Sequence, residues 1–425
     1  GAEAAWQAAK RGVRVQLWEM RPQKMTPAHQ TGLFGELVCS NSFRSRSLEN
    51  AVGLLKEEMR LLDSLIMQCA LNNQVPAGGA LAVDRLSFAR EITDILTSHP
   101  LIEVRPGEVR EIPQGFPVII ATGPLTAGSL ADRISALLGQ EYFYFYDAAA
   151  PIITADSIDR SIVFLASRYQ KGEAAYLNCP LNRDQYEEFY EALITAERHP
   201  LQDFEREAYF EGCMPVEVLA QRGKDTLRFG PLKPVGLIDP SIGKEAYAVV
   251  QLRKDNKEGT LYNLVGFQTN LKWGEQKRVF RLIPGLGRAE FARYGVMHRN
   301  SYLNSPALLS KTNQFRNNPS IFFAGQITGV EGYVESAASG LVAGLNAVRY
   351  IQGVGQLEFP VETTIGALHH YIAEGTPAEN FQPMNINFGL LPPLKQRIRK
   401  KRERNMLLAE RSIGVLESFI NISNI

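Results

Sequence analysis

The stretch from Ser320 to Tyr350 decides the fold, and it reads S-I-F-F-A-G-Q-I-T-G-V-E-G-Y-V-E-S-A-A-S-G-L-V-A-G-L-N-A-V-R-Y. Its first part, Ile321–Ala324, is a short apolar run bounded by proline and glycine, which is typical of a buried strand. A glycine-rich loop follows, and from Tyr333 onward small and apolar residues recur at helical spacing. The stretch therefore predicts a strand, a tight loop and a helix with a small-residue face.

Such a unit brings backbone N–H groups and the positive end of a helix to one point, which suits an anionic or electron-rich ligand. The small residues would let the helix lie close to a sheet or a flat cofactor. A plain strand–helix packing unit is the alternative interpretation. If the ligand interpretation holds, the candidate cofactor contacts are Gly325, Gln326, Gly329, Gly332 and Tyr333.

The beginning of the chain predicts a second piece of a cofactor site. Residues 1–11 have helical periodicity and end at Gly12, and Val13–Trp18 alternates as a strand. Gly1 stands where a G-x-G-x-x-G motif has its third glycine, and Glu19 stands where a carboxylate accepts ribose hydroxyls. The first strand and first two glycines of that motif are missing here, and a chance helix–strand pair ending in glutamate stays an alternative.

A third piece follows the predicted strand Pro117–Ala121, which runs into Ala121, Thr122 and Gly123. In dinucleotide-binding flavoproteins such an A-T-G turn passes the cofactor phosphates. Together, the three pieces predict an α/β fold with a Rossmann-like domain made from both ends of the chain. Gly285 and Gly287 do not form a second nucleotide motif because Glu290 stands in place of the third glycine. We therefore expect no independent NAD(P)H domain.

Length and composition exclude several classes of protein. The 425 residues, 45% hydrophobic and 21% charged, suit a globular protein of two or three domains. The net charge of +1 gives no global sign of a polyanionic partner. No apolar run reaches the roughly 18–20 residues that span a membrane, and no signal peptide is recognised, although the N-terminus looks cut. The four cysteines lack metal-ligand spacing, so we expect thiols in a reducing cytoplasm and no metal site.

Two of the four cysteines, Cys39 and Cys213, are candidates for a functional role. Cys39 lies in the long predicted loop Arg21–Ser47 among small polar residues, which is unusual for a buried cysteine. Both a functional and a structural role stay open for it. Cys213 lies in E-G-C-M-P-V-E, between glycine and proline. Cys69, at the end of an amphipathic helix predicted over Ser47–Ala70, is expected in the core, and Cys179 is expected to be structural.

The middle of the chain predicts a separate domain. Residues 141–304 contain strands rich in Tyr, Phe and Val and one helix over Arg183–Glu197. We expect an inserted α+β substrate domain, with residues 1–140 and 305–425 forming the two parts of the cofactor domain. The second part contains the basic run Lys395, Arg397, Arg399, Lys400, Lys401, Arg402 and Arg404. Such a run is usually a solvated helix face, but it could instead contact RNA phosphates.

Five motifs, in order along almost the whole chain, resemble the bacterial TrmFO family: E-L-V-C-S-N-S, E-G-C-M-P-V-E, F-G-P-L-K-P-V-G-L, G-F-Q-T-N-L-K-W-G-E-Q-K-R-V-F and G-V-E-G-Y-V-E-S. These are folate- and FAD-dependent tRNA (uracil-54-C5) methyltransferases related to the larger GidA flavoproteins. The resemblance implies a glutathione-reductase-type FAD domain, 5,10-methylenetetrahydrofolate as carbon donor, and NADH or NADPH as electron source. It also implies ribothymidine in the TΨC loop of tRNA as the product.

The chemistry of uracil agrees with that implication. C5 of uracil is a poor nucleophile until a thiolate adds at C6, so a flipped base must reach a cysteine. By the resemblance, Cys213 attacks C6, and Cys39 acts at the flavin–methylene adduct or removes the C5 proton; the two roles could be exchanged. His298 and Tyr333 are candidates to pack against pterin or isoalloxazine, although His298 could be a structural histidine. Lys272, Lys277 and Arg278 are candidate phosphate contacts.

Two other functions remain open at this stage. One is a GidA-type flavoprotein that modifies the wobble uridine, although such chains are longer. The other is a non-catalytic protein that binds tRNA or flavin, which would leave both cysteine motifs unexplained.

Overall fold

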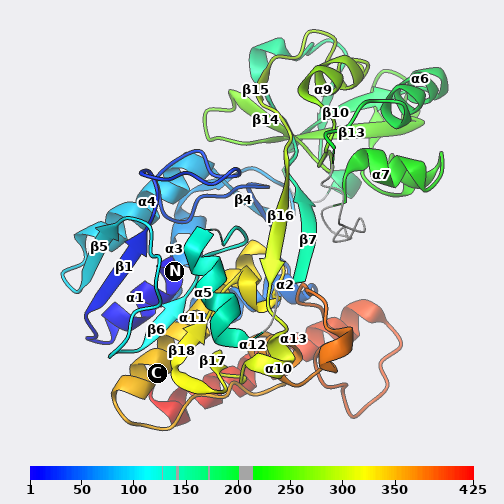
Figure 1. Cartoon of the computed structure of the whole chain (residues 1–425). Helices are drawn as coiled ribbons and strands as arrows, with labels where there is room; N and C mark the ends of the chain where they lie inside the picture. Colours follow the sequence, from blue (N-terminus) through cyan, green and yellow to red (C-terminus); the bar gives the residue numbers. More distant parts are fainter. Residues whose placement is uncertain (127, 140–142, 171–172, 201–213) are drawn as a thin grey trace.

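The computed structural model describes residues 1–126, 128–139, 143–170, 173–200 and 214–425, and it shows two lobes (Figure 1). The larger lobe contains both ends of the chain, and the smaller lobe is built from its middle. Two antiparallel strands, β7 (Phe143–Ala148) and β16 (Met297–Tyr302), run side by side between the lobes. The chain thus leaves the larger lobe and returns to it through one strand pair.

Parallel strand pairs give the larger lobe its α/β character. β1 (Val15–Glu19) pairs in parallel with β5 (Ile102–Pro106). β6 (Val118–Ile120) pairs in parallel with β18 (Asn318–Phe323), which also pairs with β17 (Gln314–Phe315). A small antiparallel sheet has the order β2 (Ser42–Ser45), β4 (Ala80–Val83) and β3 (Gln74–Val75). Because β6 and β18 lie far apart in the sequence, their pairing joins the two ends of the chain into one lobe.

Helices cover these sheets: α1 (Ala2–Lys10), α2 (Ala51–Leu61), α3 (Leu65–Asn72), α4 (Arg85–Ser98), α5 (Gly128–Leu138), α10 (Ser305–Leu308), α11 (Tyr333–Ile351), α12 (Thr364–Ala373) and α13 (Lys401–Ser423). The small-residue face of α11 packs against α1. A Cβ on Gly344 would lie 2.7 Å from the carbonyl oxygen of Ala4. The small residues therefore allow a close contact with a helix, whereas the sequence predicted a close contact with a sheet or a flat cofactor.

The prediction of a single helix over Ser47–Ala70 is wrong in one respect, because the segment forms two helices. α2 ends at Leu61, and α3 begins after Ser64, whose hydroxyl accepts a hydrogen bond from the Met67 N–H at 3.2 Å. Between them Asp63 has φ +54°, a left-handed conformation that cannot continue a helix. The apolar period continues across the break because both helices face one core.

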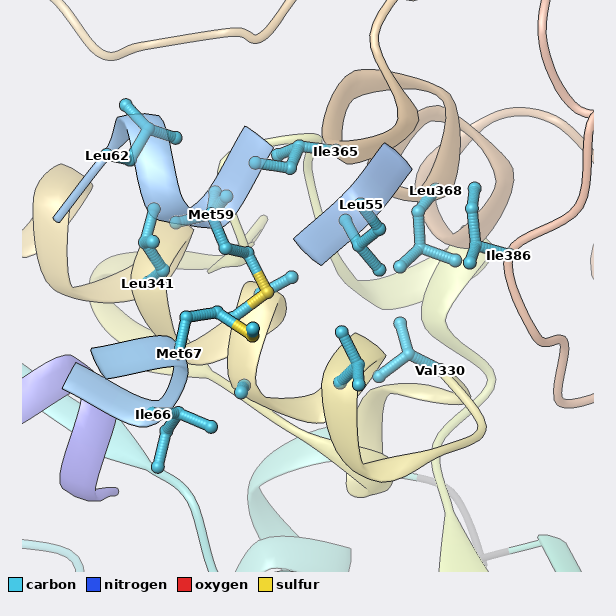
Figure 2. Packing of buried hydrophobic residues seen from close by; sticks show 14 of the residues in the cluster. Leu55, Met59, Leu62, Ile66, Met67, Val330, Leu341, Ile365, Leu368 and Ile386 are labelled. Atoms are coloured by element: carbon cyan, nitrogen blue, oxygen red, sulfur yellow. The ribbon is translucent and has the colours of Figure 1, made fainter. Parts of the chain in front are cut away.

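That core joins segments from the two ends of the chain (Figure 2). Leu55 and Met59 of α2 and Met67 of α3 pack with Leu341 of α11 and Leu368 of α12. All five side chains are at most 4% exposed. Burying this much apolar surface is the main favourable contribution to folding of the lobe, and it positions α11 and the loop before it.

The smaller lobe has a core of its own, whose buried members all lie between Ala150 and Ala289. Its antiparallel sheet has the order β15 (Phe291–Arg293), β8 (Ile152–Thr154), β14 (Leu261–Leu264), β13 (Ala248–Lys254), β10 (Tyr176–Leu181) and β9 (Phe164–Ala166). The remaining elements are α6 (Arg183–Ile194), α7 (Val216–Gln221), α8 (Thr226–Phe229), β11 (Ile238–Asp239), β12 (Lys244–Glu245) and α9 (Trp273–Phe280). Within the described part of the chain, no helix is both long and apolar enough to cross a membrane.

Candidate active site

A cavity of about 890 Å³ lies along β1 and β6, which belong to different sheets. Its lining is mainly apolar and includes the α1 residues Ala4 and Ala8. Four residues that the sequence analysis selected also line it: Gly1, Glu19, Ala121 and Thr122. The fold therefore brings together two of the three predicted pieces of a cofactor site. Gly123, which follows them, has φ +71° and turns the chain away.

Glu19 forms hydrogen bonds and an ion pair with Arg21. Its carboxylate accepts hydrogen bonds from the backbone N–H of Arg21 at 3.0 Å and from the Arg21 guanidinium at 2.9 and 3.1 Å. Burial would raise the pKa of Glu19, but these hydrogen bonds and the Arg21 charge outweigh it and lower the pKa. Arg21 also pairs with Glu36 at 3.2 Å. Glu19 is therefore an ionised acceptor, held in place for a hydroxyl or N–H donor.

The third predicted piece lies at the N-terminus of α11. Gly329 and Gly332 have φ of +81° and +108°, which side chains other than glycine rarely adopt. A Cβ on Gly332 would lie 2.4 Å from Oε2 of Glu335. That oxygen is buried and has no hydrogen-bond partner among the described residues, and no side chain caps the helix. The loop thus offers uncapped N–H groups and one acceptor oxygen to a ligand, whereas Gln326 is bonded to Glu331 at 2.7 Å.

Tyr333 links this loop to the Cys39 segment. Its hydroxyl donates to the carbonyl oxygen of Gly35 at 2.8 Å, and its ring packs against Phe43 at 5.3 Å and Phe88 at 6.1 Å. Burial raises the pKa of Tyr333, so it stays a neutral donor. Its ring is committed largely to these protein contacts. The predicted packing of Tyr333 against a cofactor stays a prediction.

Three arginines from three elements hold the segment Leu37–Asn41, and we call Arg85, Arg253 and Arg293 the arginine cluster. Arg85, the first residue of α4, donates to the carbonyl oxygens of Leu37 and Cys39. Arg293, the last residue of β15, donates to the Val38 carbonyl at 2.7 Å. Arg253, in β13, donates to Ser40 and Asn41, both at 2.9 Å. Each of the five residues therefore receives a hydrogen bond from a guanidinium group.

The charges around this segment are mostly positive. The arginine cluster supplies three guanidinium groups, and Asp255 balances one of them by pairing with Arg85 at 2.8 Å. Glu36 is the other nearby carboxylate, and it pairs with Arg21. Burial and the positive charge of Arg85 lower the pKa of Arg293, while the carboxylates Asp255 and Glu36 oppose that change. Positive charge near a half-buried thiol favours its thiolate, the reactive form.

Cys213 lies outside the described residues, as part of 201–213. The residues that follow it are firmly fixed. The Val216 N–H donates to the Gln268 carbonyl at 2.7 Å, and the buried Glu217 accepts from Thr269 at 2.9 Å and from the Asn270 N–H at 2.7 Å. Burial raises the pKa of Glu217 despite these hydrogen bonds. Val216 and Glu217 are therefore tied to the segment Gln268–Asn270, which precedes α9.

Comparison with known proteins places this geometry in a family. Residues 1–355 match the family model described as Glucose inhibited division protein A. A methylenetetrahydrofolate--tRNA-(uracil-5-)-methyltransferase TrmFO of Heliobacterium modesticaldum is 64% identical over 420 residues, covering 99% of this chain and 95% of that protein. The TrmFO of Listeria monocytogenes is 61% identical over 417 residues, covering 98% of this chain and 96% of the relative. The chain belongs to the TrmFO family.

The TrmFO resemblance seen in the sequence motifs is therefore confirmed, and so is the predicted fold class. Aquifex aeolicus GidA in its form II crystal superposes with a TM-score of 0.70, covering 99% of this chain and 72% of GidA. Its form I crystal gives a TM-score of 0.68. At 15% sequence identity this likeness concerns the fold alone.

The predicted RNA contacts fall into two groups. On α9, Arg278 pairs with Glu275 at 2.6 Å, and Lys272, just before the helix, pairs with Glu197 at 2.6 Å, while Lys277 is exposed. The basic run is exposed throughout, and Arg402 pairs with Glu49 at 2.6 Å. Only Lys401, Arg402 and Arg404 of the run belong to α13. α9 and the start of α13 lie on different lobes in Figure 1.

The remaining candidates are less informative. His298 lies in β16, where its backbone is opposite Asp147 of β7, but its side chain lies outside the described part. Cys69 and Cys179 are fully buried, and burial raises the pKa of Cys69 to about 12. Both therefore belong to the core, as predicted. The described residues contain no group of His, Cys, Asp and Glu that could hold a metal ion.

The arginine cluster could not be predicted from the sequence. Its members lie at positions 85, 253 and 293, in a helix and two strands without a shared motif. One signal was present, because R-Y-G-V-M-H-R-N begins with Arg293 and combines polar residues with a strand pattern. That signal alone does not identify Val38 as the partner.

Proposed function

We infer that this chain transfers a one-carbon unit from 5,10-methylenetetrahydrofolate to C5 of a uracil in tRNA. The observation that carries this conclusion is identity of 60–64% over nearly the full chain to relatives named for that activity. The arrangement around Cys39 suits it, because the reaction needs an activated thiol close to a cofactor site. A GidA-type wobble modification is less well supported, since the sequence identity to Aquifex aeolicus GidA is 15%.

The finer assignments are proposals. We propose uracil-54 of the TΨC loop as the target, reduced FAD as the reductant and NADH or NADPH as the electron source. We also propose the division into residues 1–140, 141–304 and 305–425, which the separate core of the smaller lobe supports. Either nicotinamide nucleotide would act on bound FAD, since the sequence predicts no separate domain for it.

The chain offers residues that fit FAD. Gly1, Glu19, Ala121 and Thr122 line the cavity along β1 and β6, and Glu19 is an ionised acceptor suited to ribose hydroxyls. The uncapped N-terminus of α11 and the acceptor oxygen of Glu335 suit a ring that carries both negative charge and an N–H group. When bound, FAD would supply the electrons that convert the transferred carbon into a methyl group.

The chain's own residues carry the uracil chemistry. The Cys213 thiolate adds to C6 of the uracil, forming an S–C6 bond and making C5 a nucleophile. C5 then bonds to the methylene carbon of the folate as one of that carbon's two bonds to nitrogen breaks. A base, for which we propose Cys39, takes the proton from C5, and the second carbon–nitrogen bond breaks, so that tetrahydrofolate leaves and a methylene group remains on C5. Once the reductant has supplied two electrons and a proton to that group, the Cys213 thiolate leaves C6 and the C5=C6 double bond is restored. The arginine cluster keeps Cys39 at a fixed place and favours its thiolate.

Methyl transfer to unmodified tRNA with labelled methylenetetrahydrofolate tests this function. Label at C5 of a uridine in the TΨC loop is the expected result. Label or modification at the wobble uridine would point to a GidA-type enzyme, and RNA binding without label would point to a non-catalytic protein.

The two cysteine roles need a separate experiment. A Cys39→Ala chain should still form a covalent adduct with tRNA, and a Cys213→Ala chain should form none. The opposite pattern would exchange the two roles.

A further inference from the structure

Three aromatic rings form a column on the surface of the smaller lobe, and we call Trp273, Tyr294 and Phe291 the ring column. Trp273 stacks on Tyr294 with centroids 5.5 Å apart and planes 12° apart. Phe291 stacks on the same tyrosine at 5.1 Å and 9°. Trp273 is 55% exposed, whereas the other two rings are half-buried. The column thus begins at Phe291 in β15 and ends at the exposed ring of Trp273, the first residue of α9.

Hydrogen bonds connect the neighbourhood of the ring column to the Cys39 segment and to described residues that follow Cys213 in the chain. Arg293, between Phe291 and Tyr294 in the chain, donates to the carbonyl oxygen of Val38, next to Cys39. On the other side, Glu217 binds Thr269 and Asn270, which lead directly to Trp273. The column therefore borders the place where we expect the reacting uracil.

Packing alone does not account for this arrangement. A tryptophan with more than half of its surface in water gains little from burial. The nearly parallel rings instead have the geometry in which a flat ring adds to a stack. Nucleobases stack on aromatic side chains whatever their sequence, and proteins that bind unpaired RNA use such platforms.

The charges beside the column suit RNA. Lys272 and Lys277 are exposed next to Trp273, and the partner of Lys272 is Glu197, itself 70% exposed on its side chain. An exposed ion pair of this kind contributes little to stability and can be replaced by a phosphate contact.

We propose that the ring column is a stacking platform for an unpaired nucleobase of the tRNA. The platform rests on the proposed function, because that function supplies an RNA whose loop must open to expose a uracil. Trp273 is the contacting residue, and Tyr294 and Phe291 keep its ring in place.

Binding of unmodified tRNA by the wild type, Trp273→Ala, Trp273→Phe and Phe229→Ala tests the platform. Phe229 is the matched control, since it lies in the same lobe and is 81% exposed. We expect Trp273→Ala to bind about tenfold more weakly, with an unchanged salt dependence because no ionic contact is lost. Trp273→Phe should keep most of the affinity, and Phe229→Ala should bind like the wild type.

Tryptophan fluorescence gives an independent measurement on the same chains. A single-stranded oligoribonucleotide should quench the wild type, a duplex should quench it less, and Trp273→Phe, which retains Trp6 and Trp18, should lose the quenching. Unchanged tRNA affinity in Trp273→Ala, equal losses in the alanine and phenylalanine variants, or quenching by tetrahydrofolate in place of RNA would each overturn the platform.

Failure of the platform and failure of the proposed function are distinguishable. If Trp273→Ala binds tRNA as the wild type does while the wild type transfers methyl groups, only the platform is overturned. A wild type that transfers no methyl group overturns the function, and the binding data still decide on the platform.

Discussion

Arg293 shows how a single residue can serve two parts of the site. Its guanidinium donates to Val38 beside Cys39, and its chain neighbours Phe291 and Tyr294 build the ring column. It is also half-buried, and its partial removal from water lowers its pKa. Taking a guanidinium partly out of water is costly unless its surroundings compensate for it, so its position indicates a defined task near the thiol.

Replacing Arg293 should therefore make Cys39 less reactive. In a Cys213→Ser background, we expect Arg293→Met to slow alkylation of Cys39 by iodoacetamide at pH 7 by about three- to tenfold, since a nearby positive charge favours the thiolate. Arg293→Lys keeps the charge and should retain most of the rate. Cys69 and Cys179 are fully buried and should not react. An unchanged rate in Arg293→Met would mean that the cluster only positions the segment.

The sequence predicts that Cys39 is a candidate functional residue, but it does not predict which residues surround Cys39 in the fold. The unusual polar neighbours of Cys39 mark it, because a core cysteine normally has apolar ones. Arg253 and Arg293 reach it only through the fold of the smaller lobe. No local pattern carries that information, since Arg85 and Arg293 contact this segment through backbone oxygens, which every residue has.

At the scale of elements, the contact between α1 and α11 depends on glycine. We expect Gly344→Ala to destabilise the larger lobe by about 2 kcal/mol, because its Cβ would lie 2.7 Å from backbone oxygen and must separate the helices. Gly414→Ala, inside α13 with nothing within 4 Å, should instead stabilise by about 0.5–1 kcal/mol. Urea unfolding measures both. Equal effects of the two substitutions would contradict the close helix contact.

Buried His369 makes α12 sensitive to acid. Its Nδ1–H donates to the Ile365 carbonyl at 2.7 Å, and burial lowers its pKa to about 4 from an ordinary 6.5. Between these values the unfolded chain binds a proton that the folded chain does not, so stability falls as the pH drops from 6.5 toward 4. At pH 5 the loss is about 2 kcal/mol.

The variant His369→Leu should lack this part of the acid sensitivity. Comparing urea unfolding of the two chains at pH 7.5 and pH 5 isolates it, because other titrating groups act on both chains alike. The wild type should lose more stability than the variant over this interval. Equal losses in both would show that His369 is protonated within the folded chain.

Elements were largely predictable because local patterns dictate them. The helix predicted over residues 1–11 is α1 (Ala2–Lys10), and the helix predicted over Arg183–Glu197 is α6 (Arg183–Ile194). Asn182 explains the start of α6, since its side chain accepts a hydrogen bond from the Gln185 N–H at 2.9 Å. The break at Asp63 could not be predicted from the sequence. It comes from a left-handed backbone conformation, and aspartate is a residue that also occurs within helices.

At the scale of the whole molecule, charge reversal tests whether the basic run contacts tRNA. We expect simultaneous reversal of Lys395, Arg397, Arg399 and Lys401 to glutamate to weaken tRNA binding. It should also flatten the salt dependence by ~0.7–0.9 log units per lost phosphate contact. Reversing Arg110 and Arg183, 74% and 73% exposed on their side chains, is the control. A salt slope equal to that of the control would mean that the basic run is a solvated surface that does not contact RNA.

The relation between the lobes was the least predictable feature. Sequence indicated a middle segment of different character, but not the contacts that join it to the rest. Arg85 with Asp255, Asn41 with the Lys254 carbonyl at 3.0 Å, and Tyr176 with the Ala77 carbonyl at 3.2 Å all cross between lobes. These pairs are distant in sequence, and only the assembled fold brings them together.

The pairing of β6 with β18 has a consequence for synthesis of the chain. Ile119 lies opposite Phe322, so β6 leaves the ribosome long before its partner strand exists. The smaller lobe, whose core lies wholly between them, can fold during that delay. The first part of the chain meanwhile exposes the apolar surface that α11 later covers. Chaperone dependence and aggregation during expression should therefore arise from residues before the inserted lobe, and nascent chains arrested after residue 304 should show it.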